Sequence, residues 1–334
     1  MGRGLPITRR RFVQAGAAAA SLGRAAFARA AEIGTPERRQ LKLGLAIDAA
    51  SFTAAYVADA RTWKPLGLEV ETITFRGDAE VAQALAGGSV DISLQSLDGL
   101  FNLLNSGQPV IGFYAGFYQA DFAWYAQPTI KSWADMKGSR IGISTFGSLT
   151  ELLTTYALRH HGLQPNEDVQ LIQVGPTASA FQALKAGRLG AAILSPPFKW
   201  FAGEQGFTLL GTEADDVAKQ WPKHIFIART KFIDDNPRTL ETFLRGFVAA
   251  IRLARADPTL TAGILADRLK LAQPYAERAY DEMMPDYNER GTLPEPYMDV
   301  FWQVEMQGGD LKAPIPESKL LDDRFIKTFD EWAP

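Results

Sequence analysis

Residues 83–98, with the sequence QALAGGSVDISLQSLD, are repeated 99 positions later as residues 182–197, QALKAGRLGAAILSPP. Five positions are identical in the two copies: Gln83 and Gln182, Ala84 and Ala183, Leu85 and Leu184, Gly88 and Gly187, and Ser96 and Ser195. Each copy predicts a helix that ends at a glycine, which tolerates the left-handed backbone of a C-cap, and then a short strand that stops at the serine. Residues 42–45 and 140–143 extend the match upstream. The pattern predicts two equivalent α/β units rather than a solenoid.

Strands and helices alternate through both units. The predicted strands are residues 42–47, 68–75, 90–94 and 110–117 in the first unit, 122–126, 140–144, 169–174 and 189–194 in the second, and 224–229, which returns the chain to the first. Helices dominate after residue 237. We therefore expect a first lobe of residues 41–117 plus 224–334, with the C-terminal helices, and a second lobe of residues 118–223. No low-complexity linker separates them, so the two crossings should form paired hinge strands.

The first thirty residues contain six arginines and no acidic residue. TRRRFVQ (residues 8–14) resembles the twin-arginine export signal, and the apolar stretch after it is too short and too weakly apolar to span a bilayer. Ala26-Phe27-Ala28 and Ala28-Arg29-Ala30 each have the small-x-small pattern of a cleavage site, so we expect cleavage after Ala28 or Ala30. We predict that residues 1–30 are a twin-arginine-type signal peptide; the alternative is a basic, disordered tail.

Charge and cysteine content narrow the class of protein further. Without residues 1–30 the chain keeps 29 basic and 38 acidic residues, a formal charge of −9, and it has no basic cluster, which argues against binding of nucleic acid. The sequence contains no cysteine, which excludes disulfides, thiolate metal sites and the acylated cysteine of a lipoprotein. We expect a monomer, free in the periplasm, without a cofactor.

A ligand site can be predicted from the topology, because ligands of open parallel sheets bind beyond the carboxyl ends of the strands. Applied to both units, this rule selects four loops, residues 48–53, 95–98, 145–150 and 195–199, that would face one cleft. We expect the following residues to bind the ligand: Ser51, Phe52, Gln95, Ser96, Thr145, Gly147, Ser148, Pro196 and Phe198. The loops offer hydroxyls, amides and aromatic rings, with Lys199 as their cation. The charge of the ligand stays open.

Two of these loops also allow a purely structural interpretation. The turn at residues 144–151 opens a helix whose free N–H groups suit an anion or a carbonyl, but Ser148 could simply cap that helix, with Glu151 completing a capping box. Two prolines fix the backbone before Phe198, which could pack on an apolar or aromatic ligand. The alternative for Phe198 is an ordinary core aromatic at the start of a helix.

We find no catalytic or metal-binding pattern in the sequence. GISTF (residues 142–146) begins like a nucleophile elbow, but Phe146 stands where the last glycine should be. His160 and His161 are neighbours at a helix end and His224 stands alone, so neither a metal triad nor a serine–histidine dyad is indicated. A glycine-rich phosphate loop is also absent. We therefore expect a protein that is not an enzyme.

Several of these features together resemble one family. They are the stretch KSWADMKGSRIGISTFGSLTELL (131–153), the repeated glycine–strand–serine units and LSPPF (194–198). They resemble the periplasmic solute-binding proteins of the nitrate/sulfonate/taurine/thiamine-precursor class, which serve ABC importers. The resemblance covers about residues 41–230. It implies an α/β architecture of the type II periplasmic-binding-protein fold, in which two α/β lobes close a cleft on a small molecule, and partners that are an inner-membrane ABC permease and its ATPase.

Two departures count against a thiamine-precursor role. Ala49 follows Asp48 where the pyrimidine-binding branch has an Asp-Trp pair, and the cysteine-rich motif of the eukaryotic synthase relatives is missing. We expect the extracytoplasmic solute-binding component of an ABC transporter, which captures a small organic molecule such as a sulfonate, an organic acid or an aromatic. The alternative is a ligand-sensing periplasmic module of a signalling receptor, because the fold alone does not decide function.

The predicted export signal can be tested in cells. Replacing Arg9 and Arg10 with lysine should leave unprocessed precursor in the cytoplasm, because the twin-arginine route reads this pair. Cell fractionation and immunoblotting measure the precursor and the mature chain. Normal maturation of the double variant would contradict the assignment.

Overall fold

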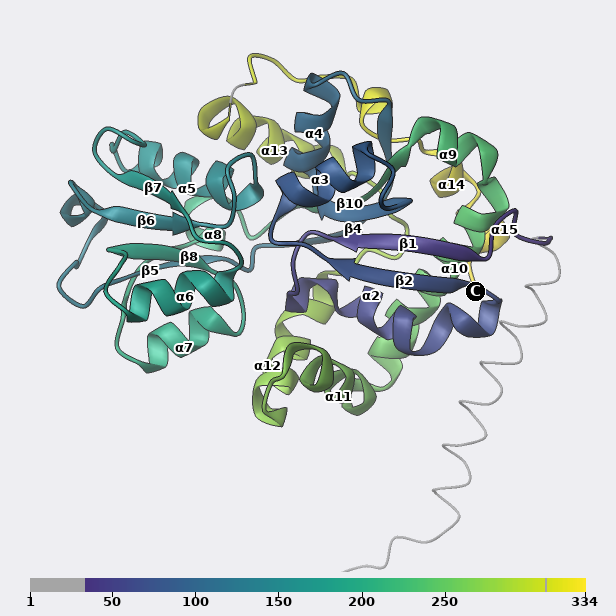
Figure 1. Ribbon diagram of the computed structural model, residues 1–334, viewed down its shortest axis with the longest axis horizontal. Helices are drawn as coiled ribbons and strands as arrows, with labels where there is room; N and C mark the ends of the chain where they lie inside the picture. Colours follow the sequence, from purple (N-terminus) through teal and green to yellow (C-terminus); the bar gives the residue numbers. More distant parts are fainter. Residues whose placement is uncertain (1–33, 310) are drawn as a thin grey trace, which may run out of the picture.

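The computed structural model describes residues 34–309 and 311–334, so the predicted signal peptide, residues 1–30, lies outside the described residues. In this part of the chain, strands form two five-stranded sheets that lie in neighbouring lobes (Figure 1). The first sheet has the order β2-β1-β3-β10-β4, with β1 Gln40–Leu45, β2 Glu69–Thr74, β3 Ile92–Ser96, β4 Val110–Gln119 and β10 Gln220–Arg229. The second has the order β7-β6-β8-β5-β9, with β5 Ala123–Ala126, β6 Arg140–Ile143, β7 Gln170–Gln173, β8 Ala191–Leu194 and β9 Thr208–Thr212.

The two sheets share one topology, which confirms the duplicated α/β units. In the first, β1 pairs in parallel with β2 and β3, and β10 pairs antiparallel with β3 and β4. In the second, β6 pairs in parallel with β7 and β8, and β5 pairs antiparallel with β8 and β9. Strand β9 was not among the predicted strands, and β10 begins four residues before the predicted strand 224–229. The exact lobe boundaries, residues 41–117 plus 224–334 for the first and 118–223 for the second, stay a proposal.

Helices cover both faces of each sheet. Those around the first sheet are α2 Thr53–Val57, α3 Asp78–Ala86, α4 Leu97–Asn105, α9 Thr230–Asp235, α10 Pro237–Ala256, α11 Pro258–Leu269, α12 Gln273–Met283, α13 Glu295–Gly308, α14 Arg324–Lys327 and α15 Phe329–Trp332. Those around the second are α5 Leu149–His160, α6 Thr177–Lys185, α7 Phe198–Glu204 and α8 Glu213–Asp216. No helix in the described part of the chain has the length and apolar character needed to cross a membrane.

A buried ion network joins the two crossings between the lobes. Lys223, near the start of β10, donates from Nζ to Asp121 and to Glu213 Oε2, the latter at 2.9 Å, and its side chain has no exposed surface. Glu213 also accepts the backbone N–H groups of Asp121 and Phe122 and the indole N–H of Trp221. Burial alone would lower the pKa of Lys223, but the charges of Asp121 and Glu213 outweigh it and raise that pKa. The lysine therefore stays charged inside the protein.

Removing this lysine should destabilise the fold strongly. Lys223→Met leaves the Asp121 and Glu213 carboxylates buried without their counter-charge, and breaking a buried pair in this way costs about 3–5 kcal/mol. Urea unfolding monitored by circular dichroism measures the loss. Lys231→Met, which removes an exposed ion pair with Asp235, is the control and should change the unfolding free energy little. Equal effects of the two substitutions would show that the buried network is not important for stability.

Candidate functional site

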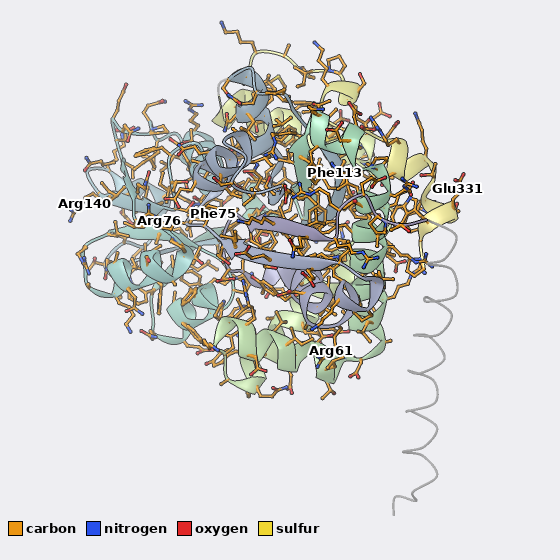
Figure 2. All side chains as sticks on the ribbon, turned by 45° about the vertical axis from the view of Figure 1, so that its right-hand side comes forward. Arg61, Phe75, Arg76, Phe113, Arg140 and Glu331 are labelled. Atoms are coloured by element: carbon orange, nitrogen blue, oxygen red, sulfur yellow. The ribbon has the colours of Figure 1, made fainter. Side chains whose placement is uncertain are left out.

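The loops that follow β2 and β6 meet at the boundary between the lobes. Phe75 and Arg76 follow β2 and lie at the edge of the first lobe that faces the second (Figure 2). The next residue is Gly77, and a Cβ built on it would lie 2.5 Å from Oγ1 of Thr145, which follows β6. The lobes therefore touch where the loop rule places the ligand, and only glycine allows an approach this close.

A carboxylate that was not among the predicted site residues connects the two lobes at this point. Asp78, the first residue of α3, accepts the N–H of Ser96 at Oδ1 (2.9 Å) and the N–H of Leu149, in the second lobe, at Oδ2 (3.1 Å). Asp78 is buried. Burial is the larger effect and raises the pKa of its carboxyl above the usual range, although the hydrogen bonds from Ser96 and Leu149 oppose this. Each carboxylate oxygen accepts one backbone N–H, Oδ1 within the first lobe and Oδ2 across the lobe boundary.

The hydroxyl groups of the turn before α5 include those of the predicted residues Thr145 and Ser148, whose hydrogen-bonding states differ. Ser148 Oγ donates to the carbonyl of Thr145 at 2.6 Å and lies 3.0 Å from Ser144 Oγ and 2.9 Å from Thr150 Oγ1. Ser144 Oγ and Thr150 Oγ1 are 2.7 Å apart, so the three hydroxyls form a closed triangle. Thr145 Oγ1 is buried and has no partner among the described residues. Thr145 is thus the predicted hydroxyl with capacity for a further hydrogen bond.

The capping box proposed at this helix is not formed. The Ser148 hydroxyl makes no capping hydrogen bond to the backbone of α5, because it is engaged with Thr145 and the neighbouring hydroxyls. The Glu151 carboxylate instead accepts the N–H of Gly147 at 2.6 Å. Gly147 has φ of +71°, a left-handed conformation that favours glycine. This residue therefore shapes the turn before α5.

The first-lobe side of the boundary is aromatic. Phe52 is buried and its ring lies edge-on to His224, with centroids 4.8 Å apart. Phe117 is 5.8 Å from the same imidazole. Tyr287 packs on Phe117 at 5.4 Å, and its hydroxyl donates to the carbonyl of Ser51 at 2.6 Å. The predicted pair Ser51 and Phe52 therefore lies in a buried aromatic environment, with the Ser51 carbonyl already bonded.

His224, which the sequence gave no reason to select, is the polar group of this aromatic cluster. It stands opposite Ser96 in the ladder between β10 and β3, and its Nδ1 is buried without a partner among the described residues. Burial, and then the charge of Lys223, lower the pKa of His224 to about 3. The ring is therefore neutral at physiological pH, and its Nδ1 can make one hydrogen bond, as donor or acceptor according to the tautomer.

The predicted residues of the repeat have local roles. Ser96 is the N-cap of α4, and its hydroxyl accepts the N–H of Gly99 at 2.9 Å. Gln95 donates from Nε2 to Ser93 Oγ at 3.1 Å and lies under α4, where a Cβ on Gly99 would be 3.0 Å from Oε1. That oxygen is buried and unpartnered among the described residues. The ligand-binding roles of Gln95 and Ser96 stay predictions.

The loop after β8 contributes chiefly to packing. Pro196 is buried, and Phe198 lies 5.9 Å from both Phe181 and Phe201 in an aromatic cluster of the second lobe. These contacts favour the core-aromatic interpretation of Phe198, whose role in binding stays a prediction.

The helix that follows this loop, α7, reaches α12 of the first lobe and closes the boundary on that side. Lys199 pairs with Glu282. The guanidinium of Arg278 lies 4.3 Å from the ring centroid of Trp200, which also stacks on Tyr275 at 6.4 Å.

Acidic groups gather behind Asp78. Burial and the charge of Asp78 raise the pKa of Asp98 to about 7, the charge of Glu151 adds to this, and hydrogen bonds to Glu305 and Asn102 oppose it. Asp98 and Glu305 are both buried. These carboxyl groups therefore form a buried acidic cluster next to Asp78.

One group in the described part of the chain has the composition of a metal site. The ligand atoms of His160, His161 and Asp216 all lie within 4.8 Å of one another. His161 Nε2 is 3.1 Å from Asp216 Oδ1, and the His161 ring stacks on Trp133 at 5.0 Å. The sequence did not indicate this group, because Asp216 is 55 residues from His161. It lies at the C-terminal end of α5, away from the contact with Asp78.

A separate hollow of about 790 Å³ opens at the other end of the first sheet. Its lining carries charges of both signs, including Arg38, Lys42, Asp59, Lys64, Glu69 and Asp91. It contains none of the predicted ligand residues.

Comparison with known proteins places the chain in a family. The sequence profile of the NMT1-like family matches residues 34–268. A putative ABC transporter periplasmic binding protein of Brachyspira hyodysenteriae is 22% identical over 223 residues, which are 62% of this chain and 63% of that protein.

Solved structures show the same fold at low sequence identity. A protein of Bordetella bronchiseptica superposes with a TM-score of 0.77 at 21% identity, covering 89% of this chain and 99% of that one. The periplasmic aliphatic sulphonate binding protein of Escherichia coli superposes with a TM-score of 0.62 at 18% identity, covering 86% of this chain and 99% of that one. The likeness confirms the type II periplasmic-binding-protein fold.

The different states of the hydroxyls before α5 give a stability prediction. Thr145→Val removes a buried hydroxyl that has no partner among the described residues, so the unfolding free energy should stay unchanged or rise by up to about 1 kcal/mol. Ser148→Ala should lower it by about 1–3 kcal/mol, because three neighbouring groups lose a hydrogen-bond partner. Urea titration of both variants measures this. The reverse order would contradict the assignment of the satisfied and the free hydroxyl.

Proposed function

Because the chain belongs to the NMT1-like family, we propose that it is the extracytoplasmic solute-binding component of an ABC importer, which captures a small organic molecule and delivers it to a membrane permease and its ATPase. The observation that carries the proposal is the pair of lobes with one topology, whose contact lies at the carboxyl ends of β2 and β6. In α/β sheets this edge is where ligands bind. The relatives in the comparison are binding proteins by name, which supports capture of a solute rather than its turnover.

The residues with free hydrogen-bonding capacity support binding between the lobes. Thr145 from the second lobe and His224 from the first each present a buried polar atom without a partner among the described residues. Buried polar atoms in native proteins are nearly always hydrogen-bonded, so an unpartnered atom at a lobe boundary indicates a ligand or water. Phe52 and Phe117 beside His224 would contact the apolar part of such a molecule.

We also propose that the mature chain is a monomer in the periplasm, exported by the twin-arginine route and not attached to lipid. The lack of cysteine supports the last point, because bacterial lipoproteins are acylated on cysteine. The arginine-rich start supports the export route.

A solute screen on the mature protein tests the proposed function. We expect one or a few compounds from a panel of sulfonates, organic acids, aromatics and uncharged polar molecules to raise the melting temperature. A solute at about a hundred times its dissociation constant adds roughly 2.7 kcal/mol to stability. Thr145→Val should then weaken binding of that compound by about tenfold or less in titration calorimetry, because one hydrogen bond is lost.

The transport role needs a second measurement. The protein loaded with that compound should stimulate the ATPase of its permease in vesicles. Binding to a receptor ectodomain without such stimulation would instead favour the sensor alternative. Turnover of the compound would contradict both.

A further inference from the structure

Three helix N-termini converge on the carboxylate of Asp78. Asp78 is the first residue of α3, Ser96 is the N-cap of α4, and Leu149 is the first residue of α5. The N–H groups of Ser96 and Leu149 both point to this carboxylate, at 2.9 and 3.1 Å. Free N–H groups and the positive end of the helix dipole make a helix N-terminus a natural seat for an anion. In this protein the carboxylate of Asp78 occupies the anion position at the N-terminus of α5.

The internal repeat shows that the contact within one lobe, between the start of a helix and the end of the following strand, does not need a charged group. The residue 99 positions after Asp78 is Thr177, the first residue of α6. Its Oγ1 lies 3.1 Å from the hydroxyl of Ser195, which is the equivalent of Ser96. In both copies the start of a helix is thus tied to the end of the following strand. Only the first copy uses a carboxylate, which also reaches Leu149 in the other lobe.

Among the described residues, the carboxylate of Asp78 is held by backbone N–H groups and not by a basic side chain. Within residues 34–309 and 311–334 it makes no ion pair with a lysine or arginine. Asp98 lies close enough for the charge of Asp78 to raise its pKa, so a second acidic group stands beside Asp78. Lys199, the cation of the predicted loops, pairs with Glu282. An anion that approached the start of α5 would therefore find the N–H of Leu149 already bonded to a carboxylate, and the nearby cation Arg76 already paired with Glu80.

We propose that Asp78 sets the charge class of the solute. The site at the lobe boundary takes uncharged or cationic organic molecules, and Asp78 excludes sulfonates, nitrate and carboxylates from the N-terminus of α5. This inference rests on the proposed solute-binding function and narrows its range of ligands to uncharged polar, aromatic and cationic compounds. It also makes the neutral ring of His224 and the hydroxyl of Thr145 the groups that meet the polar atoms of the solute.

Substitution by the residue of the second copy tests the proposal. Asp78→Thr keeps a hydroxyl near Ser96 but frees the N–H of Leu149 and removes the charge. Titration calorimetry at constant ionic strength, with chloride as the reference anion, measures binding of sodium methanesulfonate and sodium nitrate to the mature chain. We expect binding to the wild type too weak to saturate, and saturable binding to Asp78→Thr with an affinity at least about tenfold above the upper limit for the wild type, as expected for a hydrogen bond to a charged group. Asp299→Thr removes a carboxylate from an exposed position of α13 and is the control, which should behave like the wild type.

The outcomes separate this inference from the proposed function. Binding of either anion to the wild type as tight as to Asp78→Thr would overturn it, and so would a folded Asp78→Thr that gains no anion binding. Cooperative unfolding establishes that the variant is folded. If it is not, Asp78→Asn, which keeps the shape and removes the charge, should show the same gain, and its failure to do so also overturns the inference. A wild type that binds no compound of the screen while Asp78→Thr gains methanesulfonate would count against the transport role alone.

Discussion

The two lobes depend on the buried charge of Lys223 for their connection. Asp121 lies in the segment that leaves the first sheet, and Lys223 in the strand that returns to it. Glu213 accepts hydrogen bonds from both segments. Burying three charges costs more than a well-packed apolar core would, so the network is weak evidence for stability as such. All hydrogen bonds of the network, however, can form only when the two crossings adopt one arrangement relative to each other. We regard the fixing of this arrangement as the role of the network. The same arrangement sets His224, the residue after Lys223, beside the end of β3.

The contact between the lobes follows from this connection. With the crossings fixed, the edge of the first sheet faces the start of α5, and Gly77 leaves room for Thr145. Asp78 can then take its hydrogen bond from Leu149, and the hydroxyls of Ser144, Ser148 and Thr150 satisfy one another behind it. Polar groups of the boundary therefore fall into two sets, those paired within the protein and those left over. The second set includes the hydroxyl of Thr145 and the neutral ring of His224.

Much of this fold could be predicted from the sequence, because its signals are local. Helices α3 and α4 carry local signals at their ends, since glycines flank α3 and a serine caps the start of α4. Strand β9 was missed because its five residues, TLLGT, contain a glycine and carry no alternating pattern. The site was harder to predict. The partner of Asp78 is a backbone N–H 71 residues away, and a backbone N–H has no sequence signature. The repeat did contain a usable signal, because Asp78 stands where its other copy has Thr177.

This difference between the copies bears on how one fold serves several ligands. A helix N-terminus offers the same N–H groups whatever the sequence around it, so the fold by itself favours anions at this edge. The likeness to a sulphonate binding protein at 18% identity therefore extends to the fold and leaves the ligand open. A single carboxylate is enough to reverse the preference, since it satisfies the N–H of Leu149 and adds a negative charge at the same point. The duplicated chain shows both states side by side: a hydroxyl at Thr177 that stays within its lobe, and a carboxylate at Asp78 that reaches the other.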